Sequence, residues 1–181
     1  DTYTPLQLVQ YVSTIANGGY RVQPRLLKEI RKPSKDGETL GPLVKEIEPN
    51  ILNRLDNTQD EINRVREGFR RVYNGARGTA RSHFANTAYT AAGKTGTAEV
   101  VYFGPQTDRY FTNTINLVHV GFAPFDNPEV AYAVVIPWAS TSTKPSKYYN
   151  NIIARQVLDK YFELKTSYQA EGMTDRVVGQ K

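Results

Sequence analysis

Three strand-like runs follow one another in the second half of the chain, and no helical segment separates them. The first begins at Ala92 and ends in the β-branched and aromatic residues Val100 to Phe103. The second, Asn116 to Phe122, and the third, Val130 to Ile136, alternate apolar and other residues with the period of a strand. Short turns join antiparallel strands, whereas parallel strands need long crossovers. This order therefore predicts an antiparallel sheet.

Three helical segments accompany the predicted sheet. The first starts at Thr4-Pro5-Leu6-Gln7, where threonine suits the cap and proline the first helical position, and it ends at Asn17-Gly18-Gly19. The second starts at Thr58, with Glu61 completing a capping box, and ends before Gly75. We expect the first helix to be mostly buried and the last, about Tyr149 to Leu164, to cross one face of the sheet. With these helices the fold class is α+β, an antiparallel sheet packed by helices.

The connecting segments carry weaker patterns. Leu26 to Ile30 and Val44 to Ile47 favour a hairpin, and Arg77-Gly78-Thr79-Ala80 favours a tight turn near the first strand of the sheet within a loop over residues 76–90. Trp138 to Lys147 is rich in Ser, Thr and Lys and is expected to be a mobile loop. The arginines of the second helix are expected on its solvated face, in preference to an anion site.

The domain boundaries follow from these patterns. Residues 1–164 are expected to form one unit, which would be the C-terminal part of a larger domain, and residues 165–181 a polar, flexible tail. The chain begins at Asp1 without methionine and shows no signal peptide, so we expect a processed product or a fragment.

Composition removes several classes of function. The chain has no cysteine, which excludes disulfides and thiolate metal sites, and only His83 and His119 offer imidazole, so no metal site or cofactor is expected. The net charge of +5 is spread along the chain, so nucleic acid is not an expected partner. No apolar stretch has the length of a membrane span.

The start of the first strand carries a cluster of groups suited to an anionic ligand. In Gly93-Lys94-Thr95-Gly96-Thr97-Ala98-Glu99, one lysine and two threonine hydroxyls lie among glycines that leave room for close approach. Lys94, Thr95 and Thr97 suit a ligand carboxylate. If the strand lies at an edge, the Thr97 N–H faces outward and can donate to a developing oxyanion, while a peptide can add alongside as a further strand.

These residues supply only half of an acyl-transfer site, because no nucleophile accompanies them. The sequence contains no Ser-x-x-Lys and no Ser-x-Asn. The nearest approximation, Thr141-Ser142-Thr143-Lys144, lies in a polar segment and is not expected to be catalytic. A packed or solvated role is expected for His119 and a surface role for His83. By its residues alone, the chain binds a ligand and does not react with it.

The same motif resembles the third motif of class B penicillin-binding proteins, which pair Lys-Thr-Gly with Ser-x-x-Lys and Ser-x-Asn. The resemblance extends upstream to Thr4-Pro5-Leu6-Gln7-Leu8-Val9-Gln10 with Ile15-Ala16-Asn17-Gly18-Gly19, which is similar to the helix after the second motif. It covers roughly residues 4 to 164. It implies the C-terminal part of the transpeptidase domain, in the fold shared with serine β-lactamases.

What the resemblance implies is a serine-type D,D-transpeptidase that cross-links peptidoglycan stem peptides ending in D-Ala-D-Ala and is acylated by β-lactams. Lys94 would hold the catalytic lysine position of the motif, and Thr95, Gly96 and Thr97 would bind the substrate, with the Thr97 N–H in the oxyanion hole. The serine would belong to an upstream segment of the same protein. A membrane anchor would also lie upstream, and the domain would stand on the extracytoplasmic side of the cell membrane.

Three alternatives stay open at this point. The chain alone agrees with a non-catalytic module that binds cell-wall peptide. Within the same fold, a β-lactam sensor and a D,D-carboxypeptidase are the enzyme-like rivals, although the helix over residues 4–19 resembles the transpeptidases more closely. Treatment with a fluorescent penicillin distinguishes the enzyme from the binding module. Label on a co-purifying segment that carries Ser-x-x-Lys would indicate the enzyme, and no label on the intact assembly would exclude it.

Overall fold

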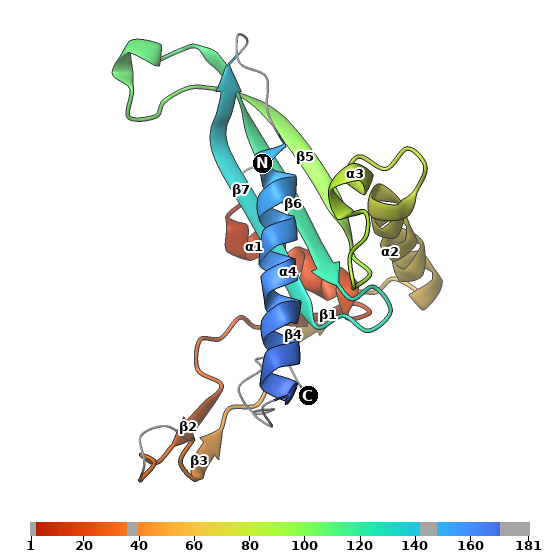
Figure 1. The fold of residues 1–181 in the computed structure, drawn as a ribbon, viewed down its shortest axis with the longest axis vertical. Coiled ribbons are helices and arrows are strands. Elements are labelled where there is room, and N and C mark those ends of the chain that lie inside the picture. The colour runs from red at the N-terminus through yellow and green to blue at the C-terminus, as the bar shows by residue number, and fades with distance from the viewer. Residues whose placement is uncertain (1–2, 36–39, 142–147, 171–181) are drawn as a thin grey trace.

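The computed structural model describes residues 3–35, 40–141 and 148–170. Its centre is a three-stranded antiparallel sheet in the order β5-β6-β7, made of β5 (Ala92–Val101), β6 (Asn113–Ala123) and β7 (Val130–Thr141). The helices α1 (Pro5–Ala16) and α4 (Tyr149–Ala170) lie on opposite faces of this sheet (Figure 1). The antiparallel sheet and the α+β class predicted from the three strand-like runs are confirmed.

The pairing of β5 with β6 fixes which side chains enter which core. Ala92 pairs with Phe122, and both lie under α1 against Val12 and Ala16. Because side chains alternate along a strand, the next position of each strand faces α4 instead. That second core gathers side chains from the sheet, α4 and the helices beside β5, namely Tyr73, Ala80, Phe84, Tyr89, Ala91, Ala123, Tyr132, Ala154 and Leu158.

The two predicted helix starts are present as capping boxes. The Thr4 hydroxyl accepts from the Gln7 backbone N–H at 3.2 Å, and the Thr58 hydroxyl accepts from the Glu61 N–H at 3.3 Å at the start of α2 (Gln59–Asn74). Only part of α1 is buried, since Val12, Ile15 and Ala16 face the core while Leu6 and Tyr11 are exposed. The expectation of a mostly buried helix is therefore wrong for its outer face.

Residues between α1 and α2 form two small antiparallel pairs. β1 (Tyr20–Val22) pairs with β4 (Ile51–Arg54), and β1 contacts α1. β2 (Glu29–Arg31) pairs with β3 (Leu43–Glu46), which confirms the predicted hairpin with its first strand shifted toward Arg31. The β2–β3 pair projects away from the sheet as an arm (Figure 1).

Four segments differ from expectation. The loop over residues 76–90 contains a short helix, α3 (Arg81–Phe84), and a 3₁₀ turn (Thr107–Arg109) lies between β5 and β6. Trp138 to Thr141 were expected in a loop but extend β7, because β6 offers pairing partners as far as Thr114. α4 continues past the expected end at Leu164 to Ala170, so the start of the predicted tail is helical. Residues 142–147, with most of the Thr-x-x-Lys segment, and 171–181 lie outside the described residues.

Candidate functional site

The Lys-Thr-Gly motif lies on the edge strand of the sheet. β5 pairs with β6 along its whole length, and no other described strand pairs with its second edge. The motif thus lies on an edge strand, which is the condition under which an outward Thr97 N–H is expected from the sequence. An edge of this kind is a template for an added strand.

The Lys94 side chain folds back onto the main chain of its neighbour Thr95. Lys94 is exposed, and its Nζ donates to the Thr95 carbonyl oxygen at 2.5 Å. The Tyr102 N–H donates to the Thr112 carbonyl at 2.9 Å, and the register of β5 with β6 is unbroken. Every second residue back from Tyr102 to Lys94 therefore turns its backbone groups toward β6, and Thr95 turns its own away from β6. Since backbone groups of an edge strand alternate in direction, those of Thr97 point the same way as those of Thr95. The geometry therefore agrees with an outward Thr97 N–H.

The four predicted site residues do not share one face of the sheet. Lys94 and Gly96 have the same parity as Ala92 and belong to the α1 face. Thr95 and Thr97 belong to the opposite face, where Thr95 pairs with the buried His119. What the four share is the free edge, so only a ligand lying along that edge meets all of them.

The two glycines of the motif have different reasons to be glycine. A Cβ on Gly93 would lie 2.1 Å from the Val120 carbonyl oxygen and 2.9 Å from the Tyr73 hydroxyl, so the fold itself excludes a side chain there. A Cβ on Gly96 would meet the Val118 side chain at 3.5 Å, an ordinary contact. Packing explains Gly93, whereas it leaves Gly96 free to be explained by a ligand.

A third hydroxyl, from outside the motif, lies beside it. The Thr79 Oγ1 lies 2.8 Å from the Thr95 Oγ1. Thr79 belongs to the turn after α2, so the tight turn expected near the first strand is confirmed. A role for the Thr79 side chain was not predicted, since nothing in the sequence pairs it with Thr95 sixteen positions later.

A buried polar cluster underlies the same stretch of β5. His119 is fully buried, and its Nε2 lies 2.5 Å from the Tyr73 hydroxyl, which also contacts the Tyr132 hydroxyl. Burial lowers the pKa of His119 to about 4 and raises the pKa of both tyrosines. The ring is therefore neutral at pH 7 and shares a hydrogen bond with a protonated tyrosine. The expectation that His119 is a packed histidine is confirmed.

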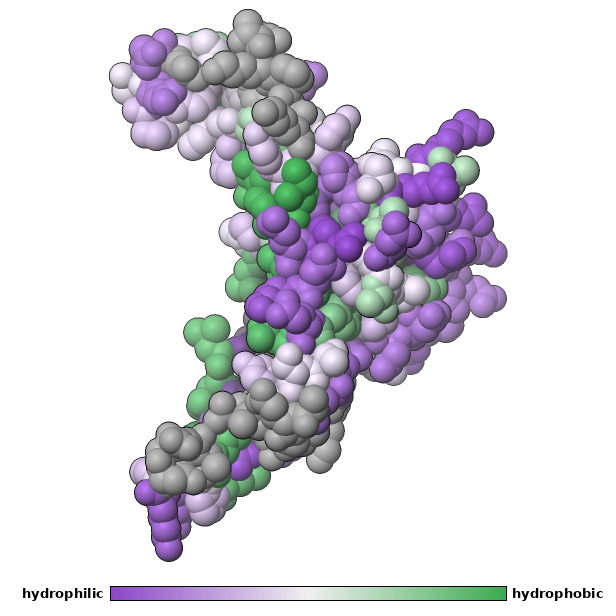
Figure 2. Space-filling model, viewed as in Figure 1, coloured by the Kyte–Doolittle hydropathy of each residue, from purple (hydrophilic) through white to green (hydrophobic). Residues whose placement is uncertain are grey.

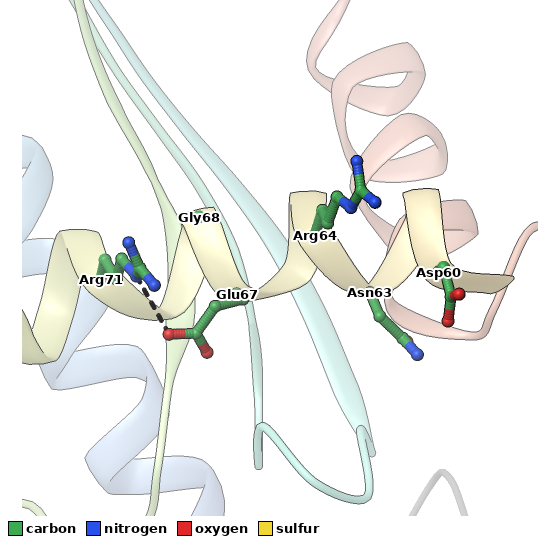
Figure 3. Close-up of a pocket in the computed structure, with 6 residues that line it drawn as sticks. All are labelled: Asp60, Asn63, Arg64, Glu67, Gly68 and Arg71. Carbon is green, nitrogen blue, oxygen red and sulfur yellow. Dashed lines mark hydrogen bonds and ion pairs between the residues drawn. The ribbon is translucent and has the colours of Figure 1, made fainter.

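Several charged side chains stand along α2 (Figure 3). Asp60, Asn63, Arg64, Glu67, Gly68 and Arg71 border an open depression there, but all of them come from one helix. Glu67 pairs with Arg70 at 2.6 Å and with Arg71 at 3.1 Å, and these hydrogen bonds lower its pKa to about 2. The lining comes from one helix without a second wall, and Arg71 is already paired with Glu67, so this surface is a solvated helix face.

Arg66 departs from that expectation. Its guanidinium donates to the Phe125 carbonyl at 2.7 Å and lies 5.7 Å from the centre of the Phe122 ring. It therefore packs against the core under the sheet and does not belong to the solvated face.

Another depression, of about 290 Å³, lies between the turn after β5 and the end of β7. Its lining includes Tyr102 and Trp138, whose rings are 5.2 Å apart, but no residue of the motif. In the described parts of the chain, no three His, Cys, Asp or Glu side chains gather where they could hold a metal. The motif edge thus remains the candidate site.

Comparison with known proteins gives a consistent result. Residues 1–159 match the model of the penicillin-binding protein transpeptidase domain. Penicillin-binding protein 2A of Bacillus subtilis (strain 168) is 46% identical over 172 residues, which is 95% of this chain and 24% of that protein. Peptidoglycan D,D-transpeptidase MrdA of Haemophilus influenzae is 30% identical over 88% of this chain and 24% of its own length. The chain thus spans about a quarter of the length of these relatives.

The fold has the same relatives. Penicillin-binding protein 2B of Streptococcus pneumoniae (strain R6) superposes with a TM-score of 0.73 at 33% identity, over 90% of this chain and 25% of that one. The structural comparison and the sequence comparisons therefore indicate the same family. It leaves the individual roles of Lys94, Thr95, Gly96 and Thr97 as predictions.

Proposed function

The chain belongs to the penicillin-binding protein transpeptidase family, and from that premise we propose that it is the C-terminal part of a class B, serine-type D,D-transpeptidase. The observation that carries the proposal is the placement of Gly93-Lys94-Thr95-Gly96-Thr97-Ala98-Glu99 on a sheet edge with which no other described strand pairs. The substrate is a peptidoglycan stem peptide ending in D-Ala-D-Ala. Relatives of this chain bear the names transpeptidase and penicillin-binding protein.

The reaction is acyl transfer in two steps. A serine hydroxyl attacks the carbonyl between the two D-Ala residues, and the terminal D-Ala leaves with the proton that the serine gives up. An amine of a neighbouring stem peptide then displaces the serine and forms the cross-link. A β-lactam carbonyl takes the place of the peptide carbonyl in the first step, which leaves the serine acylated.

Each motif residue receives a role from its position. Lys94 brings a positive charge to the edge, next to the serine of the second motif. The hydroxyls of Thr95 and Thr97 bind the terminal carboxylate through charge-assisted bonds. The Thr97 N–H donates to the oxyanion as the carbonyl is attacked, and Gly96 lets the ligand backbone come close.

The serine itself is assigned to an upstream segment of the same protein. This chain contains neither Ser-x-x-Lys nor Ser-x-Asn, and it spans about a quarter of the length of its relatives. The membrane anchor is placed upstream as well, with the domain on the extracytoplasmic side. Among residues 3–35, 40–141 and 148–170, no helix combines the length and hydrophobicity of a membrane span.

A second candidate is a non-catalytic module of the same fold that binds cell-wall peptide or a β-lactam. One observation favours it: the side chains that the described structure provides at the edge are an ammonium and hydroxyls, which suit an anionic ligand, and no described base activates a nucleophile among them. A D,D-carboxypeptidase differs from the transpeptidase only in using water in place of the amine in the second step.

Labelling with a fluorescent penicillin tests the proposal. The protein is prepared with the segment that carries Ser-x-x-Lys, treated with the drug, and cleaved by a protease so that the label can be mapped. The transpeptidase reading expects label on the serine of the upstream segment and none on this chain. An assembled protein that binds the drug reversibly without a covalent label is a binding module. A protein that is labelled but transfers the peptidyl acyl group only to water, and not to an amine, is a carboxypeptidase.

A further inference from the structure

The strongest unassigned feature of the site is the pair of hydroxyls formed by Thr79 and Thr95. Their oxygens lie 2.8 Å apart, so one hydroxyl donates to the other. Thr95 comes from the edge strand, whereas Thr79 comes from the turn that follows α2. No other pair of side chains in the described structure links that turn to the Lys-Thr-Gly motif by a hydrogen bond.

The turn holds Thr79 from both sides. The Gly78 N–H donates to the Gly75 carbonyl at 2.9 Å, and the Ala80 N–H donates to the Val72 carbonyl at 3.1 Å, so the turn folds back onto the last turn of α2. A Cβ on Gly78 would lie 2.4 Å from the Val72 carbonyl oxygen, which leaves no room for another residue. Ala80, fully buried, fixes the following position in the core. Thr79 is thus an exposed side chain on a rigidly placed backbone.

The direction of the shared hydrogen bond decides what Thr95 can offer a ligand. If Thr95 donates to Thr79, its proton is used and only lone pairs face the edge. If Thr79 donates to Thr95, the Thr95 proton is free to point outward. A carboxylate only accepts hydrogen bonds, so its arrival selects the second arrangement. In that arrangement the two hydroxyls form a chain in which each bond strengthens the next.

We propose that Thr79 is a positioning residue that directs the Thr95 proton toward the ligand carboxylate. The inference rests on the proposed function, because it assumes that a carboxylate binds at the β5 edge. The backbone of Thr95 is held independently, by the pairing of β5 with β6, in which Thr95 lies opposite His119. Thr79 therefore acts on the hydroxyl rotor alone, and its contribution is specific for ligands that carry an anionic group there.

A Thr79→Val variant tests this role in the protein assembled with its Ser-x-x-Lys segment. Valine keeps the shape and removes the hydroxyl. We expect the second-order rate of acylation by a β-lactam carboxylate to fall about 3- to 10-fold, the range for one hydrogen bond. Acylation by the methyl ester of the same β-lactam should change less than about 2-fold, since the ester has no anion to receive the proton. Thr79→Ser should restore the rate with the carboxylate.

Two controls separate positioning from a structural effect. Thr166→Val makes the same chemical change on α4, where the hydroxyl bonds only to the Phe162 carbonyl of its own helix, and should leave both rates unchanged. Thr95→Val combined with Thr79→Val should cost no more than Thr95→Val alone, because Thr79 acts through Thr95. Equal losses with carboxylate and ester, or additive losses in the double variant, would overturn the proposal.

The same experiments separate a failure of the Thr79 proposal from a failure of the proposed transpeptidase function. A wild-type assembly that no β-lactam acylates removes the proposed function, and with it the carboxylate site. A wild-type assembly that is acylated, together with an unchanged rate in Thr79→Val, removes only the role of Thr79.

Discussion

Lys94 and Gly96 contribute to the edge of β5 in opposite ways. Lys94 places a charged side chain there, whereas Gly96 has no side chain and leaves space for a ligand. Both belong to the α1 face of β5, beyond the part that α1 covers. Lys94 is exposed, and the hydrogen bond that the structure describes for its ammonium goes to the adjacent Thr95 carbonyl. Neither residue is needed to build the sheet, so substitutions at both report on ligand and reaction.

Replacing Lys94 by alanine should reduce β-lactam acylation of the assembled enzyme about 100-fold or more, the scale for removing one preorganised electrostatic group. Folding should change little, because the side chain is exposed and fills no cavity. Acylation kinetics and the thermal unfolding midpoint, measured on the same preparation, check both parts. An unchanged rate with a native midpoint would show that the lysine is not part of the site.

Gly96→Ala provides a steric test of the same edge. A methyl group at this position meets only the Val118 side chain at 3.5 Å, so stability should be unchanged or slightly higher. Acylation should nevertheless fall at least about 10-fold, since the methyl occupies space that an added strand uses. Gly93→Ala is the contrasting variant: its Cβ would lie 2.1 Å from the Val120 carbonyl oxygen, and it should lower the unfolding midpoint. A stable Gly96→Ala enzyme with normal acylation would contradict an edge-bound ligand.

At the scale of elements, the sheet was predictable because its signal is local. Alternation in Val118, Val120 and Phe122, and again in β7, reports each strand without reference to a partner. The end of β7 was missed for the opposite reason. Trp138 to Thr141 have loop-like composition and become a strand only because β6 offers them partners.

The site shows the same division between local and distant information. The motif on β5 was predicted from adjacent residues. The hydroxyl of Thr79 and the cluster of His119 with Tyr73 and Tyr132 were not, because each contact joins residues from different elements. One local signal was available: Tyr73 follows Phe69 by four positions and so shares the core-facing side of α2.

The buried cluster makes the packing of α2 on the sheet sensitive to pH. Burial is the main cause of the lowered pKa of His119, about 4 against 6.5, and the charges of Lys94 and His83 act in the same direction. Hydrogen bonds at Asn150 and Asn151 oppose the shift. Because the folded-state pKa lies below the unfolded one, the unfolded state binds more protons as pH falls below 6.5. Stability is therefore complete above that pH and declines until about pH 4.

We expect His119 to account for a loss of about 2 kcal/mol in unfolding free energy between pH 7 and pH 5. A His119→Gln variant, which does not titrate, should lose that much less over the same interval. Urea unfolding of the assembled domain at both pH values, followed by tryptophan fluorescence, measures the difference. Parallel pH dependence in the two proteins would mean that His119 titrates alike when folded and unfolded.

For the whole molecule, the informative feature is the apolar surface left exposed. The arm exposes Ile30, and the segment that leads into it exposes Leu26 and Leu27. The helix α4 exposes Ile152, Ile153 and Val157 beside the sheet. Hydrophobic patches are visible along the arm and near α4 (Figure 2). A two-stranded pair such as β2–β3 is marginal by itself and gains stability from a covering segment. The same upstream segment that is proposed to supply the serine is suited to cover these residues.

This reasoning predicts a difference between the chain alone and the chain assembled with that segment. Alone, it should bind an apolar dye such as ANS and exchange the amide hydrogens of β2, β3 and α4 quickly, because exposed apolar surface and unsupported strands open readily. In the assembly, dye binding should fall and the same amides should be protected, while β6, already paired on both sides, should be protected in both states. Mass spectrometry of hydrogen exchange resolves the elements separately. Protection of the arm without protection of α4 would place the segment on one side only, and no gain in either would mean that the serine reaches the Lys94 edge without covering this surface.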